Sequence, residues 1–162
     1  MAEVIIKKGE GRSFKSGGLW IYDNEIDRIV GDFVNGDIVE VLDFDGFFLG
    51  KGFINTNSKI TVRIMTRHRD IEIDRQFIDR LVKAAVQYRV DTVDTSSCRL
   101  IFGEADGFPG LVIDKFSDVL VVESLALGID RLKLTIIDSL KSELASRGMN
   151  IRGVYEREAM PR

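Results

Sequence analysis

Two strand-like runs joined by a tight turn occupy one stretch of the chain, GDIVEVLDFDGFFLGKGFI, residues 36–54. The first run, residues 38–43, is rich in β-branched side chains, which favour extended backbone. Asp45-Gly46 is a strong signal for a two-residue hairpin turn, because both positions tolerate positive φ. Gly50 and Gly52 interrupt the second run, where we expect a bulge or a close approach of two backbones. The stretch therefore predicts a β-hairpin.

The same strand pattern continues on both sides of the hairpin. Residues 60–65 alternate apolar and polar side chains, the period-2 signature of a half-buried strand. The aromatic and apolar residues between 20 and 26 lie at roughly helical spacing, so a short helix is expected there. Several short strands at this spacing predict a small β-barrel or sandwich over residues 1–70.

The hydrophobic period changes from 2 to 3.6 at residue 74. Asp74 is a good N-cap, and apolar residues then recur with helical spacing to about residue 90. The elements expected after this helix are strands at 99–104, 111–116 and 119–125, a helix over 129–144 that Gly148 ends, and a strand at 151–157. The fold class is thus mixed α/β (α+β), with a second domain over residues 74–162.

Composition excludes several classes of protein and site. The chain has 162 residues, 44% hydrophobic and 30% charged, with two prolines. This is enough apolar material for a core and excludes collagen-like and strongly disordered chains. A single cysteine excludes an intrachain disulfide framework and a cysteine-based zinc cluster. No apolar stretch reaches the ~20 residues of a membrane span, and no signal peptide is seen, so we expect a cytoplasmic protein with no membrane partner.

Positive charge is concentrated in two segments, although the whole chain has a net charge of −3. Residues 1–22 contain four basic and two acidic side chains, and residues 59–90 contain eight and four. The segment between them, residues 23–58, contains two basic and eight acidic side chains. A local basic face can contact phosphate even on an acidic protein, while an ordinary mixed surface is the alternative.

The single cysteine and the single histidine offer little catalytic chemistry. Cys98 has at most one neighbouring cation to stabilise a thiolate, so we expect a small apolar filler. His68 lies between two arginines, which suits a solvated or phosphate-facing position and not a metal ligand. The glycine-rich loop 103–110 lacks the Lys-Ser/Thr of a phosphate-binding loop and does not open a helix. We therefore expect no metal site and no nucleotide-binding loop.

Taken together, six sequence blocks resemble the bacterial and archaeal ribosomal-RNA large-subunit methyltransferase I family. These blocks are residues 17–26, 36–39, 55–64, 99–101, 103–114 and 154–157, and GEADGFPGL (residues 103–111) is the most specific of them. They occur in the right order over essentially the whole chain, and the resemblance is to the amino-terminal half of the family. The chain departs from the family at Gly18-Leu19, where His-Pro usually precedes the tryptophan.

The resemblance implies a PUA domain over residues 1–70, then a central α+β domain over residues 74–162. The family's third domain is a Rossmann-like methyltransferase domain, and we expect it to be absent from this chain. Members methylate carbon 5 of cytosine in ribosomal RNA with S-adenosylmethionine. Because their cofactor loop and nucleophilic cysteine lie in the third domain, we expect no cofactor and no catalytic residue in this chain, and Cys98 does not take the nucleophile's role.

For the first domain, the resemblance implies binding of structured RNA, with large-subunit ribosomal RNA as the expected partner. Glycines let backbone amides approach phosphate, cations neutralise it, and aromatic rings stack on bases. The residues expected to contact RNA are Lys7, Lys8, Arg12, Lys15, Gly17, Tyr22, Arg63 and Arg67. Trp20 can also stack on a base, but we expect it in the core. A homodimerisation module without RNA affinity is the alternative.

For the second domain, the resemblance implies that one loop forms the rim of the methyltransferase site. The residues of this predicted rim are Glu104, Asp106, Gly107, Pro109 and Gly110. The alternative is that the two acidic side chains cap backbone N–H groups of their own turn.

Overall fold

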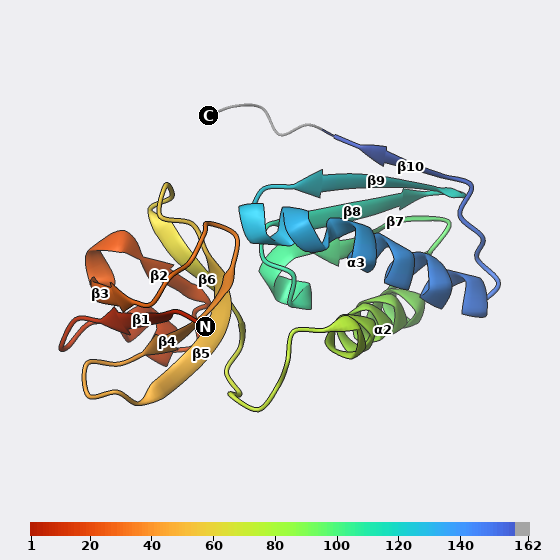
Figure 1. The fold of residues 1–162 in the computed structure, drawn as a ribbon. Helices are drawn as coiled ribbons and strands as arrows, with labels where there is room; N and C mark the ends of the chain where they lie inside the picture. The colour runs from red at the N-terminus through yellow and green to blue at the C-terminus, as the bar shows by residue number, and fades with distance from the viewer. Residues whose placement is uncertain (158–162) are drawn as a thin grey trace. The chain divides into compact units, whose positions relative to one another are not determined.

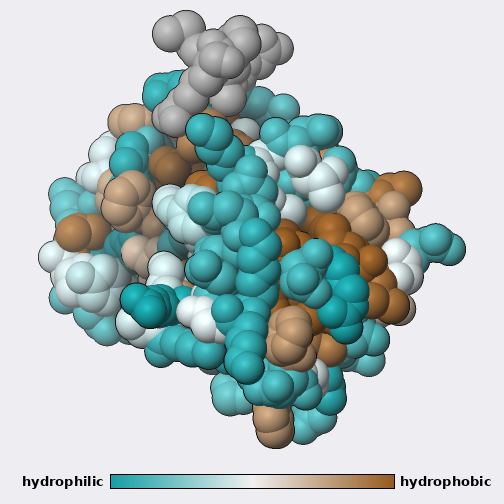
Figure 2. Space-filling model, turned by 90° about the vertical axis from the view of Figure 1, so that its left-hand side faces the viewer, coloured by the Kyte–Doolittle hydropathy of each residue, from teal (hydrophilic) through white to brown (hydrophobic). Residues whose placement is uncertain are grey.

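The computed structural model describes residues 1–157, which fold into two compact units, the second beginning at Ile73 (Figure 1). The last five residues of the predicted second domain, 158–162, lie outside the described residues. The fold is mixed α/β, as predicted. Among the described residues, no helix is long and apolar enough to cross a membrane. Hydrophilic side chains cover most of the face shown in Figure 2, and apolar ones gather in one area of it.

The first unit is a single six-stranded sheet with the strand order β2-β6-β5-β4-β1-β3. Strands β1 and β4 pair in parallel, and all other neighbours are antiparallel. Its elements are β1 (Glu3–Ile6), α1 (Arg12–Lys15), β2 (Trp20–Tyr22), the 3-10 turn η1 (Asp23–Glu25), β3 (Ile26–Val30), β4 (Ile38–Leu42), β5 (Phe48–Ile54) and β6 (Ile60–Thr66).

The sheet curls around one hydrophobic core. Ile21 of edge strand β2 and Val4 of β1 are both fully buried and belong to the same cluster, with Phe14 of α1. Strands far apart in the sheet order can share a core only if the sheet bends toward itself. Since β2 and β3 remain its two edges, the unit is an open, curled sheet and not a closed barrel.

The predicted hairpin joins β4 to β5, but its turn is longer than two residues. The Asp43 carboxylate accepts hydrogen bonds from the backbone N–H groups of Asp45 and Phe47, both at 2.9 Å. Asp43 N–H donates to the Phe47 carbonyl, so these two residues enclose a turn of three residues, 44–46. The predicted bulge is confirmed, because the register shifts between Lys51 and Gly52. A Cβ at Gly52 would lie 1.9 Å from the Arg63 carbonyl oxygen, which explains the glycine.

The short helix predicted between residues 20 and 26 is wrong for residues 20–22, and only the 3-10 turn η1 within this stretch is helical. Residues Trp20–Tyr22 form strand β2, which pairs with β6, and a 3-10 turn follows it. Bulky aromatic and β-branched side chains favour the strand, and pairing with β6 decides the outcome. The α-helical turn nearest to this stretch is α1, which comes before Gly17 and Gly18.

The second unit is a four-stranded sheet with the order β10-β9-β8-β7 and two helices. Only β9 and β10 pair in parallel. Its elements are α2 (Arg75–Thr92), β7 (Ser97–Phe102), the 3-10 turn η2 (Gly103–Asp106), β8 (Leu111–Phe116), β9 (Val119–Ser124), α3 (Leu127–Ser146) and β10 (Gly153–Glu156). Figure 1 shows both helices on the same side of the sheet.

The ends of the two helices follow the predicted signals. The Asp74 carboxylate accepts a hydrogen bond from Phe77 N–H at 2.9 Å and caps α2. At the end of α3, Gly148 has φ +79°, and Met149 N–H donates back to the Leu144 carbonyl at 2.8 Å. This left-handed C-terminal cap satisfies a carbonyl of the last turn and stops the helix.

Candidate nucleic-acid interface

Four exposed cations of the first unit lie close together in sequence. Lys7 and Lys8 follow β1, and Arg12 and Lys15 are the first and last residues of α1. All four are exposed. We call these four residues the basic loop. Their exposure leaves the ammonium and guanidinium groups available to an anion.

A buried carboxylate connects the basic loop to strand β2. Glu25 is 8% exposed, and its two oxygens accept hydrogen bonds from Gly11 N–H at 3.0 Å and Tyr22 N–H at 2.9 Å. Lys7 N–H donates to the Glu25 carbonyl at 2.8 Å. The position of the basic loop is thus fixed relative to the aromatic strand by one side chain. Sequence reasoning assigned no role to Glu25, although it lies in the block 17–26, because its partners Gly11 and Tyr22 are set only by the fold.

Arg67 makes contacts within the first unit. One of its guanidinium nitrogens donates to the carbonyls of Phe14 and Gly18, at 3.0 and 2.7 Å, and the group lies 3.8 Å from the Phe14 ring centroid. Arg67 therefore holds α1 and the loop after it. Gly17, in that loop, has φ +107° and open space where a Cβ would be. The structure gives Arg67 a positioning role, and a direct RNA contact by Arg67 stays a prediction.

Trp20, Tyr22 and Arg63 form what we call the aromatic platform. Ile21 points into the core, so its neighbours Trp20 and Tyr22 lie on the opposite face of β2 and are partly exposed. Their rings meet edge to face, with centroids 6.3 Å apart and planes at 79°. Arg63, opposite Trp20 in the register, places its guanidinium 5.3 Å from the Trp20 ring centroid. The expectation that Trp20 is in the core is wrong, because strand alternation gives that position to Ile21.

The first unit thus offers two kinds of chemistry joined by Glu25. Exposed cations can neutralise phosphate groups, and partly exposed aromatic rings can stack on bases. In contrast, His68 is exposed in the segment after β6, with no catalytic neighbour among the described contacts. No cluster of metal-ligating side chains occurs within residues 1–157.

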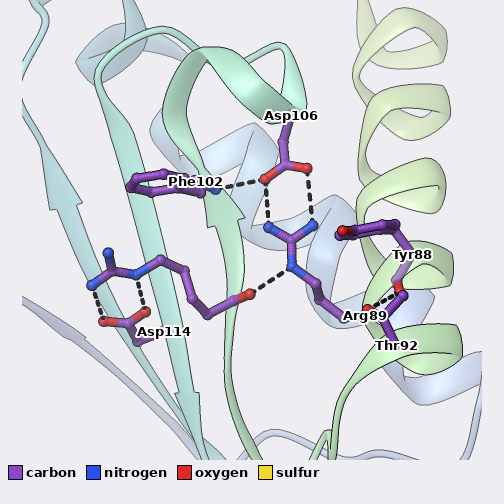
Figure 3. Close-up of polar contacts among 7 residues, drawn as sticks. Tyr88, Arg89, Thr92, Phe102, Asp106 and Asp114 are labelled. Atoms are coloured by element: carbon purple, nitrogen blue, oxygen red, sulfur yellow. Dashed lines mark hydrogen bonds and ion pairs between the residues drawn. The ribbon is translucent and has the colours of Figure 1, made fainter.

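In the second unit, the loop predicted as a rim contains a buried ion pair. Asp106 accepts two hydrogen bonds from the Arg89 guanidinium, at 3.0 and 2.8 Å, and the two side chains are 10% and 11% exposed. Asp106 also accepts from Phe102 N–H at 2.7 Å, and Arg89 donates to the Arg99 carbonyl at 2.8 Å. Figure 3 shows the pair between helix α2 and the η2 turn.

The ion pair satisfies two backbone groups of the edge strand of the sheet. Strand β7 is an edge strand, and unpaired N–H and C=O groups on such an edge are open to unwanted pairing. Arg89 satisfies a carbonyl of β7, and Asp106 satisfies an N–H of its last residue. These contacts favour the structural alternative for Asp106. Sequence reasoning missed Arg89, which stands on an apolar face of the helix and whose partner is 17 residues away.

The other predicted rim residues have different environments. Glu104 and Gly107 line a surface hollow, whereas Pro109 is buried and supports the loop from inside. Gly107 and Gly110 have φ values of +84° and +76°, which glycine adopts readily. Because Pro109 is buried, the structure gives it a supporting position in the loop, and its place in the rim stays a prediction.

Cys98 is partly buried on β7, and burial raises the pKa of its thiol above the ordinary value. A raised pKa keeps the thiol protonated near neutral pH, which is unfavourable for a nucleophile. The structure agrees with the interpretation of Cys98 as a small apolar side chain.

Known proteins support the resemblance drawn from the motifs. Residues 4–67 match the family model of the PUA-like domain. Over 141 residues, 85% of this chain, the sequence is 37% identical to the ribosomal RNA large subunit methyltransferase I of Shewanella frigidimarina and 30% identical to that of Yersinia pseudotuberculosis. The matched part is 36% of each relative, so the chain spans about a third of their length.

The fold itself is also found in a solved structure. A proposed SAM-dependent methyltransferase from Streptococcus mutans superposes on 98% of this chain with a TM-score of 0.80 and 14% identity, and the match covers 41% of that protein. At this identity the likeness concerns the fold alone.

Proposed function

We propose that this relative of the ribosomal RNA large subunit methyltransferases I binds structured RNA through its first unit and presents it to methyltransferase chemistry. The observation that carries the proposal is the combination of the basic loop and the aromatic platform, joined by Glu25. The PUA-like match covers the same residues, and the names of the relatives supply the class of RNA. Large-subunit ribosomal RNA, a cytosine as target and a cytoplasmic location are parts of this proposal.

S-adenosylmethionine is the cofactor that the relatives' chemistry implies, and the described residues do not fit it. Cofactors of this kind bind where a parallel strand leads through a glycine-rich turn into a helix. Two pairs of parallel strands occur in the described residues. Strand β1, parallel to β4, leads only into the four-residue turn α1, whereas β9 and β10 are joined by the long helix α3, and the connection between β9 and α3 is Leu125-Ala126. This connection has no glycine. We therefore derive no step through the cofactor and expect calorimetry to detect no S-adenosylmethionine binding by these 162 residues.

The test uses the single tryptophan of the chain, which lies in the aromatic platform. We expect structured ribosomal RNA to quench Trp20 fluorescence, because a stacked base contacts the indole. Binding should weaken steeply with salt, at a log–log slope of roughly −0.7 to −0.9 per phosphate contact. Replacing Lys7, Lys8, Arg12 and Lys15 by alanine should make the slope shallower by about 3.

The matched control removes four exposed cations of the second unit, Arg80, Lys83, Lys141 and Arg152, by alanine. This variant has the same net charge as the test variant, and we expect it to keep the wild-type slope. An unchanged slope in the basic-loop variant would contradict the proposed surface and direct attention to Arg63 and Arg67. A stable dimer without RNA affinity would contradict the function and support the dimerisation module.

A further inference from the structure

We propose that a groove in the second unit, between helix α2 and the η2 turn, binds one unpaired base of the RNA. The inference rests on the proposed function in that RNA is the ligand class. It adds a second contact site, in a different unit from the basic loop and the aromatic platform.

The groove consists of two adjoining hollows. One has a volume of about 760 Å³ and lies between α2 and η2, and the other, of about 440 Å³, lies beside β7. Arg89 and Phe102 line both hollows, so the two adjoin at these side chains. Volumes of 300–1,000 Å³ are typical of ligand sites and exceed what a base requires.

Two exposed aromatic rings flank the larger hollow. Tyr88 is 60% exposed and Phe102 is 53% exposed, although both belong to regular elements that bury their other face. Figure 3 shows the two rings on opposite sides of the Arg89–Asp106 ion pair. Ala84 of α2 and Ala105 of η2 also line this hollow, and their side chains are small.

Each ring is accompanied by an arginine. The Arg89 guanidinium lies 5.0 Å from the Tyr88 ring centroid, and that of Arg99 lies 5.3 Å from the Phe102 centroid. Arginine beside an exposed ring is the combination that single-stranded nucleic-acid sites use, since the ring stacks on the base and the cation adds attraction for ring and phosphate. Both guanidinium groups are also ion-paired, Arg89 with Asp106 and Arg99 with Asp114, so the exposed rings supply the main contact with the base.

The ion pair gives the groove a rigid floor. Arg89 and Asp106 are held by four hydrogen bonds to each other and to the backbone of β7. Asp106 accepts a hydrogen bond from the backbone N–H of Phe102, so the position of the Phe102 ring depends on the same contacts. A site that is rigid before binding loses less conformational entropy when a base enters it.

The experiment is an NMR titration of the 162-residue chain with adenosine and cytidine monophosphates. We expect the largest shifts at the amides of Ala84, Ala105 and Gly107, which line the groove. The variant Tyr88→Ala/Phe102→Ala should weaken binding by about fivefold for each ring removed, the lower end for stacking on a base. The variant Tyr88→Phe should bind like the wild type.

The matched control is Phe116→Ala/Tyr155→Ala, which removes two aromatic rings of the same unit that are 52% and 64% exposed and lie outside the groove. It should bind the nucleotides normally. Equal affinity in the two double variants, or shifts confined to other residues, would overturn the proposal. So would a dimer that the groove variant dissolves, because the groove would then bind a second copy.

The two proposals fail separately. If RNA does not quench Trp20 but the nucleotides still shift the groove amides, only the function proposed for the first unit is contradicted. Normal quenching without shifts in the groove contradicts the base site alone. Circular dichroism melting of each variant confirms that it is folded.

Discussion

Substituting Asp106 by asparagine should strongly destabilise the second unit. The sequence predicts a place in the rim for this residue, with a cap of its own turn as the alternative. The structure adds a role that neither of these includes: Asp106 forms a bidentate ion pair with Arg89, and only about a tenth of each side chain is exposed. An asparagine keeps one acceptor oxygen, places an NH₂ group against the guanidinium and leaves the arginine charge without a counter-charge.

The magnitude follows from burial and from the number of groups involved. Removing one partner of a buried ion pair costs about 3–5 kcal/mol, and the acceptor that asparagine retains sets the value at about 3 kcal/mol. For a unit of roughly 90 residues, each 1 kcal/mol lowers the melting temperature by about 4–8 °C. We therefore expect a decrease of about 12–24 °C.

The control is Asp114→Asn, which breaks the ion pair of Asp114 with Arg99. That pair is also bidentate, at 2.8 and 3.3 Å, but half of the Arg99 side chain is exposed. Exposed pairs contribute about 0–1 kcal/mol, so the control should melt within a few degrees of the wild type. The assay is thermal and urea unfolding, with amide hydrogen exchange at Phe102 and Leu100 to assign the transition to the second unit.

Equal melting temperatures for Asp106→Asn and Asp114→Asn would refute the reasoning, because burial would then not matter. The double variant Arg89→Met/Asp106→Leu adds a second criterion. Apolar replacement of a buried ion pair is often neutral. Here it would leave the Arg99 carbonyl and the Phe102 N–H without partners, so stability should not be restored. A wild-type melting temperature in this variant would show that the hydrogen bonds to the Arg99 carbonyl and the Phe102 N–H contribute nothing to stability.

Two further changes test the packing and electrostatics of each unit. Gly52→Ala should destabilise the first unit by at least about 3 kcal/mol in urea unfolding, because its Cβ would lie 1.9 Å from the Arg63 carbonyl oxygen, whereas Gly46→Ala, with open space and φ +90°, should cost only about 1 kcal/mol. Similar values for the two would contradict the close approach. Hydrogen bonds from Ser139 and then Arg75 lower the pKa of Asp79, so the folded state releases this proton at lower pH than the unfolded state. Its stabilisation is complete above about pH 4 and is lost as pH falls further, and Asp79→Asn should flatten the acid limb of the stability profile of the second unit. An unchanged acid limb would contradict this assignment.

The sequence predicts most of the elements because their signals are local. Asp74 caps α2, Gly148 ends α3, and the alternation of residues 60–65 gives β6. The failure at Trp20–Tyr22 has a physical cause, since three strand residues followed by a turn imitate helical spacing over seven positions. Pairing with β6, about 40 residues away in sequence, decides the outcome, and no local pattern reports it.

The candidate site is less predictable, because its residues act through partners distant in the chain. The exposure of the basic loop follows from charge alone. The contacts of Arg67 with Phe14 and Gly18 span about 50 residues and depend on the curl of the sheet. Sequence reasoning therefore places Arg67 among the RNA contacts, whereas the structure uses its guanidinium to hold α1.

Both units follow the same principle at the sites proposed to contact RNA. In the first, the buried Glu25 carboxylate satisfies two backbone N–H groups and fixes the exposed basic loop beside Tyr22. In the second, the buried Asp106 carboxylate satisfies a backbone N–H and fixes exposed Phe102 beside the groove. An exposed cation or ring recognises a ligand only if its backbone is held in place, and backbone amides in irregular segments need an acceptor to be held. Buried acids that hold exposed rings and cations in place are thus compatible with the proposed binding of an anion by an acidic chain.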